Sequence, residues 1–142
     1  MTLFTKEHVL VPMDFSDMAK QALAETLEFV GDPQKIHVLH VLSNLEATEP
    51  GVIWGTVNNE NRIDHIHTLF NETFPDDAYR QMKFGVKVGD PSAEIIDYAE
   101  HNEIDLIIVA SHGRSGIAKF FMGSVAERVV RFAHCAVLVL RD

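Results

Sequence analysis

The chain has 142 residues, which matches one ordinary domain because single domains cluster at about 100–150 residues. Hydrophobic residues make up 46% and charged residues 23%, a mixture typical of a globular protein, so we expect a single domain over residues 1–142. Lysine and arginine number 12 against 21 aspartates and glutamates, which leaves a net charge of −9. A body this acidic repels phosphate backbones and anionic lipid, which argues against a general nucleic-acid binder and a membrane-surface protein.

Cysteine usage and hydropathy exclude several further classes. A single cysteine, Cys135, excludes a disulfide within the chain and a zinc site built from several cysteines. The longest apolar runs, such as Ala136–Leu140, are far shorter than the roughly 20 residues of a membrane span. The first residues lack a basic region followed by an apolar stretch, so no signal peptide is predicted. We therefore expect a cytoplasmic protein.

The first half of the chain alternates between apolar runs and segments with helical spacing. His8–Val11 is an apolar run that predicts a buried strand. Ser16 is a candidate N-cap for a helix that ends at Gly31. Ile36–Leu42 predicts a second strand, and the polar residues Ser43–Thr56 predict a long surface loop. A second helix follows, with a buried face of Ile63, Ile66, Leu69 and Phe70.

The second half continues the same alternation. Phe84–Val88 predicts a third strand, and Asp90–Pro91 is a strong helix start, with aspartate as N-cap and proline at the first helical position. Asp105–Ala110 is the most apolar strand and therefore the expected central one. A helix over Val125–Ala133 and a strand over Ala136–Leu140 end the chain. Five strands alternating with helices predict a three-layer α/β/α domain with a mostly parallel sheet.

The end of the first predicted strand carries a candidate ligand-binding carboxylate. In open α/β sheets, ligands bind beyond the carboxyl ends of the strands, where the strand order reverses. Asp14 directly follows the first strand, so it can accept hydrogen bonds from the amino or hydroxyl groups of a ligand. The alternative is a turn aspartate that bonds its own backbone.

The end of the fourth predicted strand leads into a glycine-bearing loop. Gly113 and Gly116 permit backbone conformations and close approaches that other residues do not. Ser124 and Glu127 have the spacing of a capping box at the start of the last helix. Such a helix start offers unpaired N–H groups and a positive dipole end to a phosphate. The alternative is a glycine turn followed by a well-capped helix.

Other chemistry-bearing patterns are weak. No Gly-Lys-Ser/Thr ends a glycine loop, and no Gly-x-Gly-x-x-Gly follows the first strand. The spacings of His37 with His40 and of His65 with His67 place each pair on different sides of its element, so no dedicated metal site is predicted. Ser111 and His112 are adjacent, but no third residue completes a catalytic triad.

A set of short segments spread over nearly the whole chain forms a family pattern. The segments are Val9–Ser16, His37–Val41, Gly89–Pro91, Asp105–Val109, Ser111–Gly116, Gly123–Val130 and Cys135–Leu140. This pattern resembles the universal stress protein family. The ATP-binding branch of that family carries glycine, two residues, glycine, nine residues, and then glycine with serine or threonine. Gly113, Gly123 and Ser124 match that motif, whereas Ala110 stands in place of its first glycine.

The resemblance implies a fold, a ligand and a set of site residues. The implied fold is Rossmann-like, of the adenine nucleotide alpha hydrolase type, with strand order 3-2-1-4-5. The implied ligand is ATP, with Mg²⁺ arriving through its phosphates. By the resemblance, Asp14 and the backbone of Val41 hold the adenine end. The residues implied to flank the nucleoside or wrap the phosphates are Pro12, Met13, Ala110, Gly113, Arg114, Gly123, Ser124, Val125 and Ala126. Because Ala110 ends a strand, we expect the motif glycine to provide room rather than a positive φ.

The expected function is a small regulatory or stress-response protein that binds ATP and hydrolyses it slowly at most. Two alternatives remain open: a nucleotide-free dimeric interaction module of the same fold, and a slow ATPase.

Ala136–Leu140 is apolar on both faces and has no charge or proline to protect an edge. With the implied strand order this strand lies at the sheet edge, which predicts a homodimer through residues 136–140.

Overall fold

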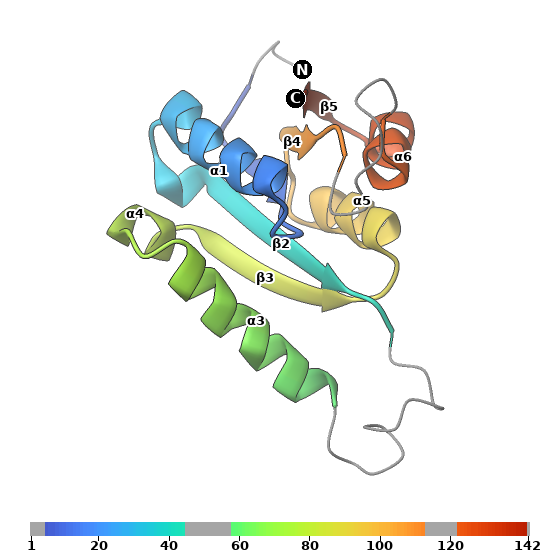
Figure 1. Ribbon diagram of the computed structural model, residues 1–142. Coiled ribbons are helices and arrows are strands. Elements are labelled where there is room, and N and C mark those ends of the chain that lie inside the picture. Colours follow the sequence, from blue (N-terminus) through green and yellow to red (C-terminus); the bar gives the residue numbers. More distant parts are fainter. Residues whose placement is uncertain (1–4, 45–57, 113–121, 142) are drawn as a thin grey trace.

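The computed structural model describes residues 5–44, 58–112 and 122–141, and its centre is a five-stranded sheet (Figure 1). The strands are β1 (Val9–Pro12), β2 (Ile36–Leu42), β3 (Lys83–Val88), β4 (Leu106–Ala110) and β5 (Ala136–Leu140). Every strand pair is parallel, and the spatial order is β3-β2-β1-β4-β5. The predicted fold class and the strand order implied by the family resemblance are therefore confirmed.

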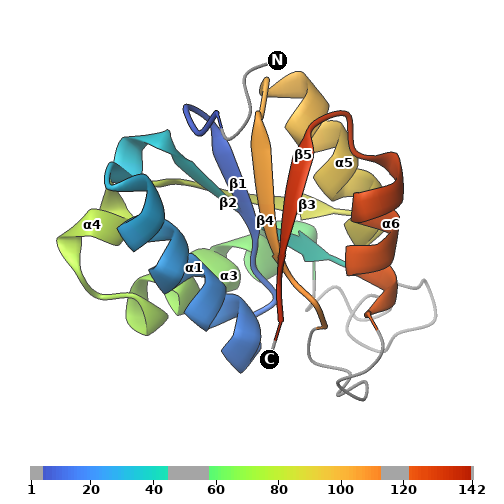
Figure 2. The same cartoon turned by 90° about the horizontal axis from the view of Figure 1, so that it is seen from above.

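Helices cover both faces of the sheet (Figure 2). They are α1 (Asp17–Val30), a 3₁₀ turn η1 (Pro33–Lys35), α3 (Asn59–Thr73), α4 (Asp77–Arg80), α5 (Pro91–His101) and α6 (Ser124–Phe132). The helices α1, α3 and α4 lie on one side, whereas α5 and α6 lie on the other (Figure 2). Within the described ranges, no helix combines the length and the apolar character needed to cross a membrane.

Two hydrophobic cores follow from the alternation of side chains along the strands. Val9 and Val11 of β1 face α1 and α3, whereas Leu10 between them faces α5 and α6. The central strands β1 and β4 are buried on both faces, as expected for parallel strands covered by helices. The outer strand β5 is different, because Leu138 remains 42% exposed. Burial therefore decreases from the centre of the sheet toward its β5 edge.

The helix ends show where local sequence signals suffice. Ser16 caps α1, because its hydroxyl accepts a hydrogen bond from the Ala19 N–H, and Gly31 ends this helix with a φ of 79°. Asp90 caps α5 in the same way, with its side chain accepting from the Ala93 N–H. These predictions are confirmed.

The predicted capping box at α6 is wrong. The N-cap is Gly123, which has no side chain to cap the helix, and Ser124 is already helical. The reason is tertiary: the Gly123 N–H donates to the Ser111 carbonyl at 2.7 Å, so the chain enters the helix one residue earlier than the box requires. Glu127 instead accepts a hydrogen bond from Arg131, one turn along the helix. The N-cap residue of α6 thus offers no side-chain cap to the first turn.

Candidate functional site

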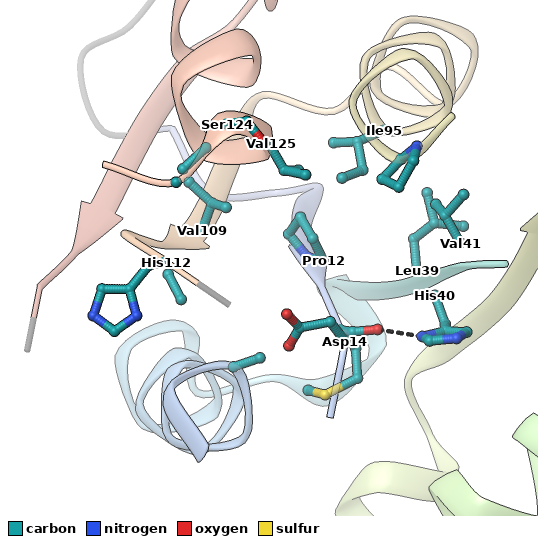
Figure 3. A pocket seen from close by; sticks show the side chains of 16 residues that line it. Pro12, Asp14, Leu39, His40, Val41, Ile95, Val109, His112, Ser124 and Val125 are labelled. Carbon is teal, nitrogen blue, oxygen red and sulfur yellow. Dashed lines mark hydrogen bonds between the residues drawn. The ribbon is translucent and has the colours of Figure 1, made fainter. Parts of the chain in front are cut away.

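A pocket of about 380 Å³ opens at the carboxyl ends of β1 and β4 (Figure 3). The strand order reverses between these two strands, because the chain leaves β1 for β2 on one side and later returns to β4 on the other. Ligands of open α/β sheets bind at such a switch point. The volume lies within the range of about 300–1,000 Å³ that is usual for small-molecule pockets.

The structure brings distant predicted site residues together in this pocket. The lining residues that were predicted are Pro12, Met13, Asp14, Val41, Ala110, Gly123, Ser124, Val125 and Ala126. They come from the ends of β1, β2 and β4 and from the first turn of α6. Gly113 and Arg114, also predicted, lie outside the described residues. The assignment of these residues to a nucleotide stays a prediction.

Several lining residues were not singled out from the sequence. They are Ala19, Leu39, His40, Pro91, Ile95, Val109 and His112. Leu39, Ile95 and Val109 are almost fully buried and give the pocket an apolar floor. His40 lies near the carboxyl end of β2, next to β1, and this position could have indicated a pocket residue. From the sequence it is considered only as a metal ligand, paired with His37.

Asp14 forms the turn that was the alternative prediction for this residue, and one of its oxygens remains available. Its Oδ1 accepts a hydrogen bond from the Ser16 N–H at 2.9 Å, which is an Asx turn. Among the described residues, Oδ2 has no hydrogen-bond partner, and the carboxylate points into the pocket (Figure 3). One oxygen therefore fixes the turn, while the other is available to a donor group of a ligand.

The first turn of α6 forms another wall of the pocket. The N–H groups of an α-helix's first turn have no partners within the helix, and the N-cap Gly123 has no side chain that could cap them. A Cβ added at Gly123 would lie 3.3 Å from the His112 Cα and 3.4 Å from the Ser111 carbonyl oxygen. The glycine therefore allows the helix start to lie directly against the end of β4. This wall presents unpaired donors and the positive end of the helix dipole.

Ala110 takes the place of the first motif glycine without strain. It is the last residue of β4 and pairs with Leu140 of β5. Its φ is not positive, since Phe15 and Glu103 are the non-glycine residues with positive φ in the described parts of the chain. The expectation of strand-like backbone at Ala110 is confirmed. A positive φ is therefore not what this position requires.

His112 contributes to the pocket wall. Both of its ring nitrogens are buried, and neither has a hydrogen-bond partner among the described residues. Within the described ranges, no group of three or more His, Cys, Asp or Glu side chains could hold a metal ion.

Fold and pocket together define a Rossmann-like α/β protein with a pocket at its switch point. Residues 6–141 match the universal stress protein family, and the chain belongs to that family. It is 30% identical to universal stress protein MJ0531 of Methanocaldococcus jannaschii, over 94% of this chain and 81% of that protein.

Solved structures of the family share the fold. Universal stress protein UspA from Lactobacillus plantarum has a TM-score of 0.71 and 26% identity, and the match covers 96% of this chain and 98% of that chain. A family member from Arabidopsis thaliana, solved with AMP bound, has a TM-score of 0.63. At 21% identity, with 95% of this chain and 92% of that chain covered, the latter likeness shows the fold alone.

Proposed function

We propose that this universal stress protein binds ATP in the pocket between β1 and β4. The observation that carries the proposal is the meeting of two complementary groups in one pocket. The Asp14 carboxylate accepts hydrogen bonds, whereas the uncapped first turn of α6 donates them. A nucleotide carries donors on its nucleoside and anionic acceptors on its phosphates, so it matches this pair. The bound AMP of the Arabidopsis relative supports an adenine nucleotide as the ligand.

The geometry also supports an orientation for the nucleotide. The apolar side chains of Leu39, Val41 and Ile95 suit a flat base at one end of the pocket. The phosphates belong at the start of α6, where each charge-assisted hydrogen bond contributes roughly 1.5–3 kcal/mol. The helix dipole adds only about 0.3–1 kcal/mol. In a protein with a net charge of −9, this local geometry must offset the general repulsion of an anion. Mg²⁺ would bind mainly through the phosphates themselves.

Two measurements test the proposal. Mass spectrometry of small molecules released from the purified, denatured protein should show an adenine nucleotide, and calorimetry should show ATP binding. Asp14→Ala should weaken ATP binding about tenfold or more, because a charge-assisted hydrogen bond is lost. Asp17→Ala is the matched control: it removes the same charge three residues away, outside the pocket, and should leave the affinity unchanged. A wild-type protein that carries no nucleotide and does not bind millimolar ATP would contradict the proposal.

We expect a regulatory binding protein rather than an efficient enzyme. Phosphate release should stay far below the 1–10³ s⁻¹ that is roughly typical of enzymes. Sustained release of several phosphates per second would establish an ATPase instead.

A homodimer through β5 is the second part of the proposal. β5 pairs with β4 on one side and lies at the edge of the described sheet. Apolar surface is exposed around this edge at Leu138 (42%), Val130 (45%) and Phe132 (58%). A second β5 would satisfy the outer backbone groups of the strand and cover part of this surface.

One substitution tests whether the outer edge of β5 forms the proposed dimer contact. The Leu140 carbonyl accepts a hydrogen bond from the Ser111 N–H, so Leu140 points its backbone groups inward. Backbone groups alternate along a strand, and Val139 therefore points its N–H outward. Val139→Pro removes that donor and should convert a dimer to a monomer in light scattering, while Val139→Thr should remain dimeric. A monomeric wild type at tens of micromolar, on the order of ordinary specific affinities, would contradict the dimer.

A further inference from the structure

The turn that carries Asp14 is held on both flanks by one side chain, His40. The His40 Nδ1–H donates a hydrogen bond to the Met13 carbonyl at 2.6 Å, directly before Asp14. The His40 ring also packs against the Phe15 ring, with 5.3 Å between the ring centroids, directly after Asp14. His40 comes from β2 and lies at the rim of the pocket (Figure 3).

The contact with Met13 determines that Nδ1 of the His40 ring carries a hydrogen. A carbonyl oxygen can only accept a hydrogen bond, so His40 Nδ1 must carry the hydrogen. Met13 is 2% exposed, and its N–H already donates to the Leu39 carbonyl at 2.8 Å. Without His40, its carbonyl would lose this donor in a largely buried environment, which disfavours the observed turn.

The contact with Phe15 stabilises an unfavourable backbone conformation. Phe15 has a φ of 63°, the left-handed region that a bulky residue avoids. Such conformations persist only where the surroundings impose them, and they concentrate at functional sites. Here the Asp14 Oδ1 bond to the Ser16 N–H and the His40–Phe15 ring contact act on the same turn. The turn sets the direction of the Asp14 side chain, whose Oδ2 has no partner among the described residues.

We propose that His40 is a positioning residue that aims the Asp14 carboxylate at a hydrogen-bond donor of the bound nucleoside. This inference rests on the proposed nucleotide-binding function. The donor is the 6-amino group of adenine or a hydroxyl of the ribose, which share the chemistry that a carboxylate recognises. His40 thereby controls how strongly the pocket prefers ATP over analogues that lack the donor, and this effect passes through Asp14.

The experiment measures that preference by calorimetry with three ligands. Purine riboside triphosphate lacks the 6-amino group, and 2′,3′-dideoxy-ATP lacks the ribose hydroxyls. Wild type should prefer ATP over one of these analogues about tenfold or more, and that analogue identifies the donor. Asp14→Ala should abolish the preference. His40→Phe keeps a ring beside Phe15 but has no donor for Met13, and should reduce the preference to about threefold or less. His40→Asn restores an N–H donor and should retain most of the preference.

Two further variants keep the test decisive. Phe15→Ala removes the ring contact but keeps a residue that avoids a positive φ, so it should also lower the preference, and it serves if His40→Phe does not fold. Adding His40→Phe to Asp14→Ala should change the preference no further, because His40 acts through Asp14. A further drop in the double variant would show direct contact between His40 and the ligand and would overturn the proposal.

The remaining outcomes separate this inference from the proposed function. If wild type binds ATP but His40→Phe and Phe15→Ala keep its full preference, the role of His40 is overturned and nucleotide binding stands. If wild type binds none of the three nucleotides, the proposed function fails and this inference fails with it.

Discussion

The helices α5 and α6 begin at the same pocket but present opposite chemistry to it. At α5, the Asp90 carboxylate accepts hydrogen bonds from the Ala93 N–H at 3.0 Å and the Ser92 hydroxyl at 2.8 Å. These bonds hold the pKa of Asp90 below its usual value. At α6, the N-cap is Gly123, which has no side chain to cap the first turn.

This difference indicates which helix start can receive an anion. The first turn of α5 already has a carboxylate of the chain itself, which satisfies N–H donors and repels a second negative charge. The first turn of α6 leaves its donors unpaired within the helix, and its N-cap glycine carries no side chain that could cap them. The comparison therefore favours α6 as the position of the phosphates of the proposed nucleotide.

The largest effect is expected from giving α6 the cap that α5 has. Gly123→Asp places a carboxylate where the phosphates are proposed to bind, so ATP affinity should fall about 100-fold, which corresponds to losing one or two charge-assisted hydrogen bonds. Gly123→Asn introduces the same crowding against Ser111 and His112 and can cap without a charge. It should weaken binding much less. Calorimetry with ATP measures both variants, and an equal loss in the two would assign the effect to crowding rather than to charge.

A second experiment tests how His37, a buried histidine that contacts the other end of α5, affects stability at different pH values. His37 of β2 is 4% exposed, and its Nδ1 forms a hydrogen bond with the Tyr98 hydroxyl of α5 at 2.7 Å. Burial, followed by the charges of Lys83 and His8, lowers the pKa of His37 from 6.5 to about 4. The unfolded chain therefore binds a proton more readily than the folded protein between these two pH values. The contribution of His37 to stability is complete above pH 6.5 and declines as the pH falls toward 4.

Urea unfolding checks this pH dependence. From pH 7 to pH 5, the free energy of unfolding of wild type should fall more steeply than that of His37→Leu, which cannot titrate at this position. The carboxylates titrate in both proteins, so the difference between the two slopes isolates His37. Parallel pH profiles would show that the buried imidazole does not control acid stability.

A smaller effect is expected from removing the cap of α5. Asp90→Ala should lower the urea midpoint at neutral pH, because the Ala93 N–H and the Ser92 hydroxyl lose their acceptor. The lowered pKa of Asp90 means that this stabilisation is present at neutral pH and is lost on acidification. ATP affinity should stay within about twofold of wild type. A loss as large as that of Gly123→Asp would place the phosphates at α5 instead.

The smallest effect is expected at Ala110. Ala110→Gly restores the family motif, but the strand backbone at this position does not require glycine. The change should lower the free energy of unfolding by about 0.5–1 kcal/mol, since glycine weakens a strand interior. ATP affinity should change by less than about threefold. A gain of tenfold or more in calorimetry would show that the alanine methyl group obstructs the nucleotide.

The sequence by itself determined those elements whose signals are local. The caps at Ser16 and Asp90 and the stop at Gly31 were predicted correctly, because each depends on a few neighbouring residues. The strands were predicted within one or two residues, since their apolar runs are distinct. The short helix α4 and the turn η1 were not predicted, because elements of three or four residues have too little periodicity to stand out.

Only the tertiary structure decided how the pocket is assembled. The start of α6 was placed one residue late, because its true N-cap depends on the Gly123 bond to Ser111, twelve positions earlier in the chain. The contacts of His40 were not predicted for a related reason: its partners Met13 and Phe15 belong to a different strand end. A sequence pattern reports which face or turn a residue prefers, but contacts between distant segments depend on strand order and register. Here the parallel pairing of β2, β1 and β4 brings three strand ends to one edge, and their side chains meet there.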